Sequence, residues 1–177
     1  MEGNLPAERD EEGRPEIRDT GIYSAFQRWE ADGCIDVVFA HSVLRLEQDN
    51  LLDITVIYGD GTKTATKKGG DKVVALCDRR CNVIAPFVAA PGNHNESPLL
   101  REALPEVARI ARMVGIDLQG TIVSLDGVYD CRSNRKGIFN ARGGKRSKRG
   151  RKPLLESAIF DERFPTIQRV FAWKDKF

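Results

Sequence analysis

Apolar residues recur at helical spacing in the first third of the chain. After Thr20, a candidate N-cap, the apolar positions follow one another at spacings of three and four, and Gly33 separates two such stretches. The two stripes comprise Ile22, Phe26, Trp29, Ile35, Val38, Phe39 and Leu46. Residues 20–48 are therefore predicted to form a small helical hairpin. A plain packing unit and a DNA-reading helix-turn-helix share this pattern, so both interpretations stay open.

The pattern then changes to apolar, β-branched runs that are typical of strands. LLDITVIY at 51–58 predicts the first strand, and Gly59-Asp60-Gly61 after it predicts a turn. The polar, alternating stretch 62–71 fits an edge strand or a loop. Residues 72–78 and 82–90 predict two more strands joined by the tight turn DRRC. Three strands in succession indicate an antiparallel meander.

The clearest helix signal lies between residues 97 and 115. Ser97 is the expected N-cap, Pro98 suits the first turn, and Gly115 supplies a C-terminal stop. The apolar face between them consists of Leu99, Ala103, Leu104, Val107, Ile110, Ala111 and Val114.

The remaining elements complete an α/β order. GTIVSLDG at 120–127 is apolar without alternation, which predicts a parallel strand buried on both faces. A short helix is expected over 131–140 and a last one from about Phe160. The sequence therefore predicts a mixed sheet of order β-β-β-α-β-α, preceded by the helical hairpin.

Composition suits one soluble domain with a short appendage. The chain has 177 residues, of which 41% are hydrophobic and 31% charged. No apolar run approaches the ~20 residues that a bilayer span needs, and the N-terminus lacks a basic-then-apolar signal. We therefore expect a cytoplasmic protein with no membrane partner.

The net charge of +2 hides a strong segregation of charge along the chain. Residues 2–16 hold six acids and two bases, within a predicted acidic, flexible tail at 1–19, whereas residues 142–152 hold seven bases and no acid. The predicted basic loop spans 141–153 and would contact phosphates without reading sequence, although a merely solvated loop has the same composition. Its bases are Arg142, Lys145, Arg146, Lys148, Arg149, Arg151 and Lys152.

The cysteines and histidines indicate neither a disulfide framework nor structural zinc. Cys77 and Cys81 have a spacing found in some zinc sites, but no second Cys/His pair completes a tetrahedral set. The two histidines, His41 and His94, stand alone.

Two aspartates occupy costly positions in the predicted strands. Asp53 lies inside LLDITVIY, and Asp126 ends the TIVSL run, where the carboxyl ends of parallel strands gather ligands. In one interpretation Asp53 starts a bend and Asp126 caps the next helix. In the other, the two carboxylates share a divalent cation such as Mg²⁺ or Mn²⁺, which favours hard oxygen ligands and supports phosphodiester chemistry.

Several stretches in this order resemble one family. They are LLDITVIYGDGTKTATKKGGD, CDRRCNVIAPFVAAPGNHNESPLLREALP, SLDGVYDCRSNRKGIFN and ERFPTIQRVFAWKDKF. Together they are similar to DDE-class transposases of bacterial insertion sequences, which have a ribonuclease-H-like catalytic core. The resemblance covers about residues 20–177 and implies a core at 49–177 that binds double-stranded DNA, at transposon ends and at the target, as a possible homodimer.

The resemblance also implies site residues. Asp53 would be the first catalytic aspartate and Asp126 the second, while Asp60 would be a turn residue and Asp130 a helix-start residue. The family's third acid corresponds to Gln168 in TIQRVFAW, and a Gln amide brings no negative charge to a metal. Glu162 and Asp175 lie about 9 and 10 Å along a helix from that position, too far to replace it.

The chain also lacks two segments of the family pattern. A short Gly/Tyr/His-containing stretch is missing between Asp71 and Lys72, and an apolar segment, expected to be a core strand, is replaced after Asn140 by ARGG. The chain stops at Phe177, where relatives continue with an Arg-rich helix. It therefore resembles a shortened, degenerate copy with an incomplete core.

These features lead to three hypotheses about function. The first is a transposase that cleaves DNA and transfers strands with a metal ion, impaired in this copy. The second is a catalytically silent DNA-binding remnant, and the third is a structure-selective nuclease. Phosphate contacts are also expected from Asn134, Arg135 and Lys136, unless these form a solvated helix face, and Trp173 is a candidate for stacking on a base.

Overall fold

The computed structural model describes residues 13, 19–64, 70–144 and 156–176, and the account below concerns these residues. The chain divides into two units, Met1–Phe39 and Ala40–Phe177. Each is described by itself.

The first unit contains one complete helix and the first residues of a second. Helix α1 spans Asp19–Ala31, and α2 begins at Cys34 and continues to Gln48 in the second unit. Between the two helices Gly33 adopts a left-handed φ of 70°, which ends the first helix as expected. The helix begins at Asp19, so Thr20 lies within it and is not its cap. The apolar side chains of α1 are exposed, and a hairpin between the helices stays a prediction.

Strand β1, Val56–Thr64, differs from the expected strand in its position along the chain. The expected turn at Gly59-Asp60-Gly61 is wrong, because β1 runs through it and pairs with the next strand along its whole length from Ile57 to Thr64. Residues 51–55 instead precede the strand. The two glycines are compatible with a strand here because neighbouring side chains fill the space that their missing Cβ atoms leave.

Strand β2, Asp71–Asp78, confirms the second predicted strand. The DRRC turn follows it, closed by a hydrogen bond from the Cys81 amide to the Asp78 carbonyl. The third strand is shorter than expected: β3 spans only Val88–Pro91, and Val83 contributes an isolated bridge to Cys77 before it. The meander of three antiparallel strands is confirmed.

Helix α3, Glu96–Val114, confirms the strongest helix prediction, and Gly115 ends it in a left-handed conformation. The N-cap is Asn95 rather than Ser97, since the Asn95 side chain accepts a hydrogen bond from the Ser97 amide. Its apolar face lies against β2 and β3, where Leu100 and Ala103 are fully buried.

Strand β4, Ile122–Ser124, is parallel to β1 as predicted but is not buried on both faces. It lies at the edge of a four-stranded sheet of order β3-β2-β1-β4, and Ile122 is 39% exposed. After β4 come a 3₁₀ turn, η1, at Gly127–Tyr129 and two helices, α4 at Arg132–Ala141 and α5 at Ser157–Lys174.

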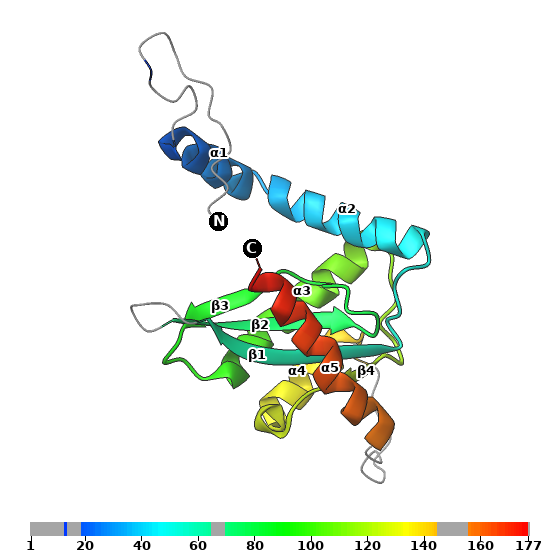
Figure 1. The fold of residues 1–177 in the computed structure, drawn as a ribbon. Helices are drawn as coiled ribbons and strands as arrows, with labels where there is room; N and C mark the ends of the chain where they lie inside the picture. Colours follow the sequence, from blue (N-terminus) through cyan, green and yellow to red (C-terminus); the bar gives the residue numbers. More distant parts are fainter. Residues whose placement is uncertain (1–12, 14–18, 65–69, 145–155, 177) are drawn as a thin grey trace. The chain divides into compact units, whose positions relative to one another are not determined.

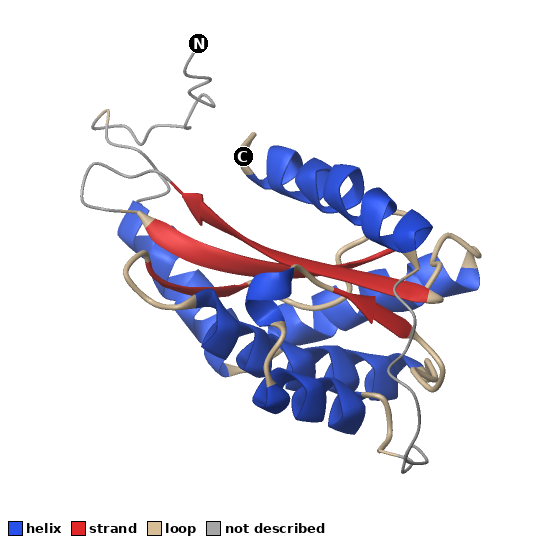
Figure 2. Cartoon of the chain, turned by 90° about the horizontal axis from the view of Figure 1, so that it is seen from below, coloured by secondary structure: helices blue, strands red, loops and turns tan. Residues whose placement is uncertain are grey.

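The sheet lies between two helical layers (Figures 1 and 2). On one face, Ile57, Val74 and Leu76 pack with α3 and its neighbours. On the other face, the core formed by Val56 and Tyr58 packs against α5. The α/β class with a mixed sheet is therefore confirmed. None of the described helices has the length and apolar character needed to cross a membrane.

Candidate functional site

The carboxylate of Asp60 projects from the centre of the sheet towards α5. Alternate residues of a strand share a face, so Asp60 lies on the same side as Val56 and Tyr58, which pack against that helix. Its side chain is partly buried. One carboxylate oxygen accepts a hydrogen bond from the Gly61 amide at 2.8 Å. Burial is the main reason that the pKa of the Asp60 carboxyl is raised above its usual value.

Asp126 continues the line of β4 into extended backbone and is exposed. The last paired residues of the parallel strands are Tyr58 and Ser124. Two residues further on come Asp60, still in β1, and Asp126, just beyond the end of β4. The Leu125 side chain fills the space at Gly59, so the alternation of faces directs the next residue of each segment, Asp60 and Asp126, to the opposite face together. The charge of Asp126 contributes to the raised pKa of Asp60. The structure thus brings these two carboxylates together.

A cation of the chain itself reaches this pair. Arg163 of α5 donates from Nη1 to Oδ2 of Asp60 at 3.0 Å, and only 5% of the arginine is exposed. Its Nε is buried and has no hydrogen-bond partner in the described part of the chain. The guanidinium also lies over the ring of Phe160, 5.3 Å from the ring centroid.

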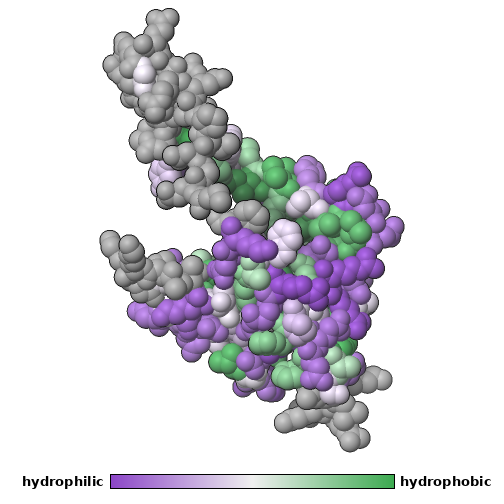
Figure 3. Space-filling view, in the orientation of Figure 1, coloured by the Kyte–Doolittle hydropathy of each residue, from purple (hydrophilic) through white to green (hydrophobic). Residues whose placement is uncertain are grey.

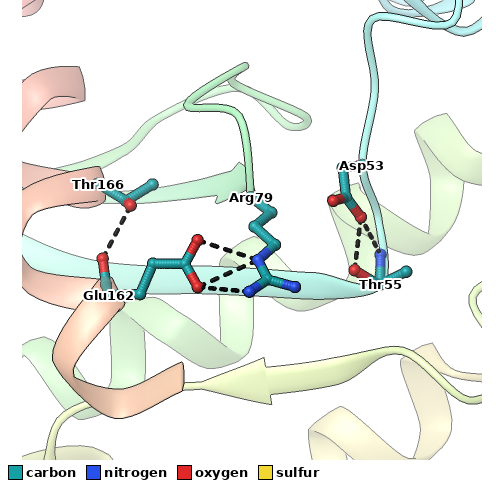
Figure 4. Close-up of polar contacts among 5 residues, drawn as sticks. All are labelled: Asp53, Thr55, Arg79, Glu162 and Thr166. Carbon is teal, nitrogen blue, oxygen red and sulfur yellow. Dashed lines mark hydrogen bonds and ion pairs between the residues drawn. The ribbon is translucent and has the colours of Figure 1, made fainter. Parts of the chain in front are cut away.

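Asp53 is not part of this site. It precedes β1 and so lies outside the strand in which it was expected; Oδ1 accepts hydrogen bonds from the amide and the hydroxyl of Thr55, as Figure 4 shows. These bonds, the hydroxyl first, hold the pKa of the Asp53 carboxyl below its usual range. Asp126 lies two residues beyond the pair Tyr58–Ser124, towards Asp60, whereas Asp53 precedes Val56, and the four steps from Val56 to Asp60 alone span about 13 Å of strand. The expected pairing of Asp53 with Asp126 is therefore wrong, and the interpretation of Asp53 as the start of a bend describes its contacts.

Gln168 does not join the carboxylates either. It is exposed, whereas the residues of α5 that face the sheet are Arg163, Thr166, Ile167, Val170 and Phe171. The two acids considered as replacements have other partners. Glu162 binds Arg79 through both carboxylate oxygens, with Nη2 2.8 Å from Oε2 (Figure 4), and Asp175 lies 2.7 Å from the ammonium of Lys174.

A second polar cluster lies behind Asp60 on the opposite face of β1. The buried Tyr129 donates to Oε2 of Glu96 at 3.2 Å, and Oε1 of the same carboxylate lies 3.1 Å from the ammonium of Lys72. Burial raises the pKa of the Tyr129 hydroxyl, with Glu96 adding to the effect. A Cβ on Gly61 would lie 2.8 Å from the Tyr129 hydroxyl, so the glycine permits this packing.

The residues present fit one divalent cation better than two. Two adjacent carboxylates of like charge, one of them partly buried, offer hard oxygen ligands whose mutual repulsion a cation would relieve. However, the described residues include no group of three or more His, Cys, Asp or Glu side chains able to hold a metal ion. Arg163 also occupies one oxygen of Asp60. A two-metal arrangement therefore lacks its ligands here.

The residues expected to contact phosphate differ in their surroundings. Asn134 is fully buried: it donates to the Tyr129 carbonyl and accepts from Arg101, so the expectation of a phosphate contact there is wrong. Arg135 is exposed but paired with Asp130 through two hydrogen bonds of 2.6 and 2.7 Å. Lys136 is exposed, and the half-buried Arg142 has a buried Nε with no partner in the described segments. The bases Lys145, Arg146, Lys148, Arg149, Arg151 and Lys152 lie outside the described residues.

Sequence reasoning missed Asp60 and Arg163. Asp60 was assigned to a turn because the glycines on both sides of it indicate one. In a longer strand, however, its spacing of two and four residues from Tyr58 and Val56 would place it on their buried face. For Arg163, no sequence signal distinguished it from the other bases of the last helix.

The comparisons with known proteins add no identification. No protein-family model, no curated protein and no solved structure matches this chain.

Proposed function

We propose that this chain is a transposase-type DNA-handling protein with a ribonuclease-H-like core, acting on DNA phosphodiesters with Mg²⁺ or Mn²⁺ and impaired in this copy. The observation that carries the proposal is that Asp60 in β1 and Asp126, just beyond the end of the parallel strand β4, each lie two residues past the last pair of the two strands, close enough for the charge of Asp126 to raise the pKa of Asp60. This pair takes the place that the sequence had given to Asp53 and Asp126.

The sheet supports the proposal through its topology. Three antiparallel strands followed by a helix and a strand parallel to the first, in the order β3-β2-β1-β4, are compatible with a ribonuclease-H-like fold. Asp126 lies just beyond the carboxyl end of β4, where open α/β sheets commonly hold their ligands.

The residues have separate roles in this proposal. Asp60 and Asp126 would hold the cation, which when bound would act as a Lewis acid on the charge that develops at the phosphodiester. Arg163 positions the Asp60 carboxylate and competes with the cation for it. Lys136 and Arg142 would contact the DNA backbone, and the basic run after Arg142 would extend that contact. A homodimer on DNA and a cytoplasmic location remain expectations.

A nicking assay on supercoiled DNA tests the proposal. With Mg²⁺ or Mn²⁺, the unmodified chain should nick slowly, and Asp60→Asn and Asp126→Asn should each reduce nicking to the level seen with EDTA. Asp53→Asn is the matched control and should retain it, since Asp53 holds only its own turn. Nicking that survives both Asp60→Asn and Asp126→Asn, or that is lost with Asp53→Asn, would contradict the assignment.

A second function, a catalytically silent DNA-binding remnant, is favoured by the contacts of α5. The helix presents Arg163 to Asp60, while Gln168 is exposed on another side. This function predicts duplex binding without cleavage, whose log K falls with log salt at a slope of about −6 if seven bases each neutralise one phosphate. Gln168→Glu should then restore little nicking. Rapid nicking by the unmodified chain would exclude this candidate.

A further inference from the structure

A groove of about 600 Å³ lies between the C-terminal part of α5 and the turn after β2. Three basic residues line it, Arg80, Arg169 and Lys174, together with the aromatic residues Phe87 and Trp173. The lining contains no acidic side chain from the described part of the chain. This combination differs from the carboxylate pair in both charge and chemistry.

One wall of the groove is held rigidly by a buried carboxylate. Asp78 is fully buried and accepts hydrogen bonds from the amides of Asp53, Arg80 and Asn82 and from the Asn82 side chain. Within the same turn Cys81 adopts a left-handed φ of 72°, a strained conformation for a residue with a side chain. The turn that carries Arg80 is thus fixed before any ligand arrives.

Two guanidinium groups of the groove lack a carboxylate partner among the described residues. Arg80 donates to the Asn50 carbonyl at 2.6 Å, and Arg169 makes one long contact of 3.5 Å to the Pro165 carbonyl of its own helix. The neighbouring Arg79, by contrast, is neutralised by Glu162. Lys174 contacts Asp175, so Arg80 and Arg169 are the cations that an incoming anion would meet.

The aromatic side chains are unusually exposed for their size. Trp173 is 66% exposed on α5, and Phe87, on the segment before β3, is 40% exposed. The face that carries α5 is a mosaic of hydrophilic and hydrophobic surface (Figure 3). Flat aromatic faces beside cations are the elements that bind unpaired bases and their phosphates, whereas an acidic peptide would need only the cations.

We propose that this groove binds an unpaired nucleotide segment of a nucleic acid, with a base stacked on Trp173 and a phosphate between Arg169 and Arg80. Trp173 lies ten residues after Arg163 on α5, about 15 Å along the helix axis, so the groove is separate from the carboxylate pair. The proposal requires neither cation binding nor cleavage, and its test is independent of the nicking assay.

The test is a binding measurement on the full chain in EDTA with fluorescein-labelled strands. A ten-nucleotide oligothymidylate should bind about tenfold more tightly than an abasic strand of the same length and charge, since one stacked base accounts for roughly 5–150-fold. Oligouridylate distinguishes RNA from DNA, and thymidine monophosphate distinguishes a free nucleotide from a strand. In a Trp29→Phe background, the fluorescence of Trp173 should also be quenched by the strand.

Three variants make the assignment specific. Trp173→Ala should weaken oligothymidylate binding about tenfold and Trp173→Phe much less. Arg169→Ala should weaken it severalfold and reduce the salt dependence. Arg112→Ala is the matched control, an exposed helical arginine that also donates to a carbonyl of its own helix, Ala108, and lies outside this groove; it should bind normally.

Several outcomes would overturn the proposal. Equal affinity for the abasic strand or for a polyglutamate peptide would show a site for any polyanion, and equal affinity for duplex DNA would show that unpaired bases are not recognised. Unchanged binding by Trp173→Ala, with an unchanged circular dichroism spectrum, would remove Trp173 from the site. If the unmodified chain binds the strand but does not nick DNA, the proposed function is contradicted and the proposal for the groove stands.

Discussion

Arg163 and Asp60 form a largely buried ion pair, 3.0 Å between Nη1 and Oδ2, in the place where the proposed site would hold a cation. Arg163 is 5% exposed, and the pKa of Asp60 is nevertheless raised, because burial outweighs the attraction of the arginine. The protein therefore supplies part of the positive charge that the two aspartates require. Breaking the ion pair between Arg163 and Asp60 should change both the stability of the fold and the affinity of the site for a cation.

Replacing Arg163 should strengthen cation binding. In Arg163→Met the Asp60 carboxylate loses its guanidinium partner, and the site becomes more negative by one charge, which is worth ~1.4 kcal/mol or about tenfold in affinity for Mn²⁺ at a partly exposed site. Isothermal titration calorimetry measures the change. Asp126→Asn in the same background should abolish the gain, and an unchanged affinity would show that Arg163 does not compete.

The same variant should change the dependence of stability on pH. Without Arg163 the folded-state pKa of Asp60 rises further above its unfolded value of ~3.9, so the folded protein holds that proton more tightly. Stability relative to the unmodified chain should therefore fall as pH rises from the folded-state pKa of Asp60 in the unmodified chain, already raised, to the higher folded-state pKa in the variant, and stay constant above it. Urea unfolding at a series of pH values measures this, and a difference independent of pH would refute it.

Asp78 should be among the most sensitive aspartates for stability. Its buried carboxylate accepts four hydrogen bonds from described residues, so Asp78→Ala would leave three amides and a side-chain donor without their acceptor, at a cost of ~2–4 kcal/mol. Urea denaturation measures the loss. Asp49→Ala, which removes only an exposed contact to Arg45, should cost no more than about 0.5 kcal/mol, and equal losses would contradict the role given to Asp78.

A methyl group at Gly59 should destabilise the sheet. Its Cβ would lie 2.6 Å from side-chain carbons of both Leu76 and Leu125, and overpacking of this kind costs ~1–3 kcal/mol. Gly127→Ala is the control, since nothing lies within 4 Å of the added carbon. Thermal unfolding of the two variants should differ clearly. Similar melting temperatures would mean that the two leucines move aside without cost.

Among the cysteines that are not buried, Cys131 should have the most reactive thiol. Hydrogen bonding, first to Ser133 and then to the Asn134 amide, lowers its pKa to about 7, while burial raises the pKa of Cys81. The alkylation rate of Cys131 by iodoacetamide should rise through a midpoint near pH 7, as followed by peptide mass spectrometry. Ser133→Ala should move the midpoint upward, and an unmoved midpoint would dissociate the shift from that hydroxyl.

Element types followed from local patterns more reliably than the positions of carboxylates did. The α3 helix and the meander were predictable because apolar spacing and turn residues specify them locally. The site was not, because Gly59 and Gly61 indicate a turn unless the long-range pairing of β1 with β2 is known. The contact between Arg163 and Asp60 joins residues 103 positions apart, which no local pattern encodes.

The two glycines beside Asp60 have a further consequence for how β1 can align with its neighbours. Leu76 and Leu125 fill the space at Gly59, and Tyr129 fills the space at Gly61, so a side chain brought to either place would collide with them. Sliding β1 along β2 in steps of two keeps the alternation of faces but places Ile57 or Gly61 where Gly59 now lies. At least one direction of slippage is thereby blocked. The two glycines, which have no side chains, therefore help to fix the position of the Asp60 carboxylate along the sheet.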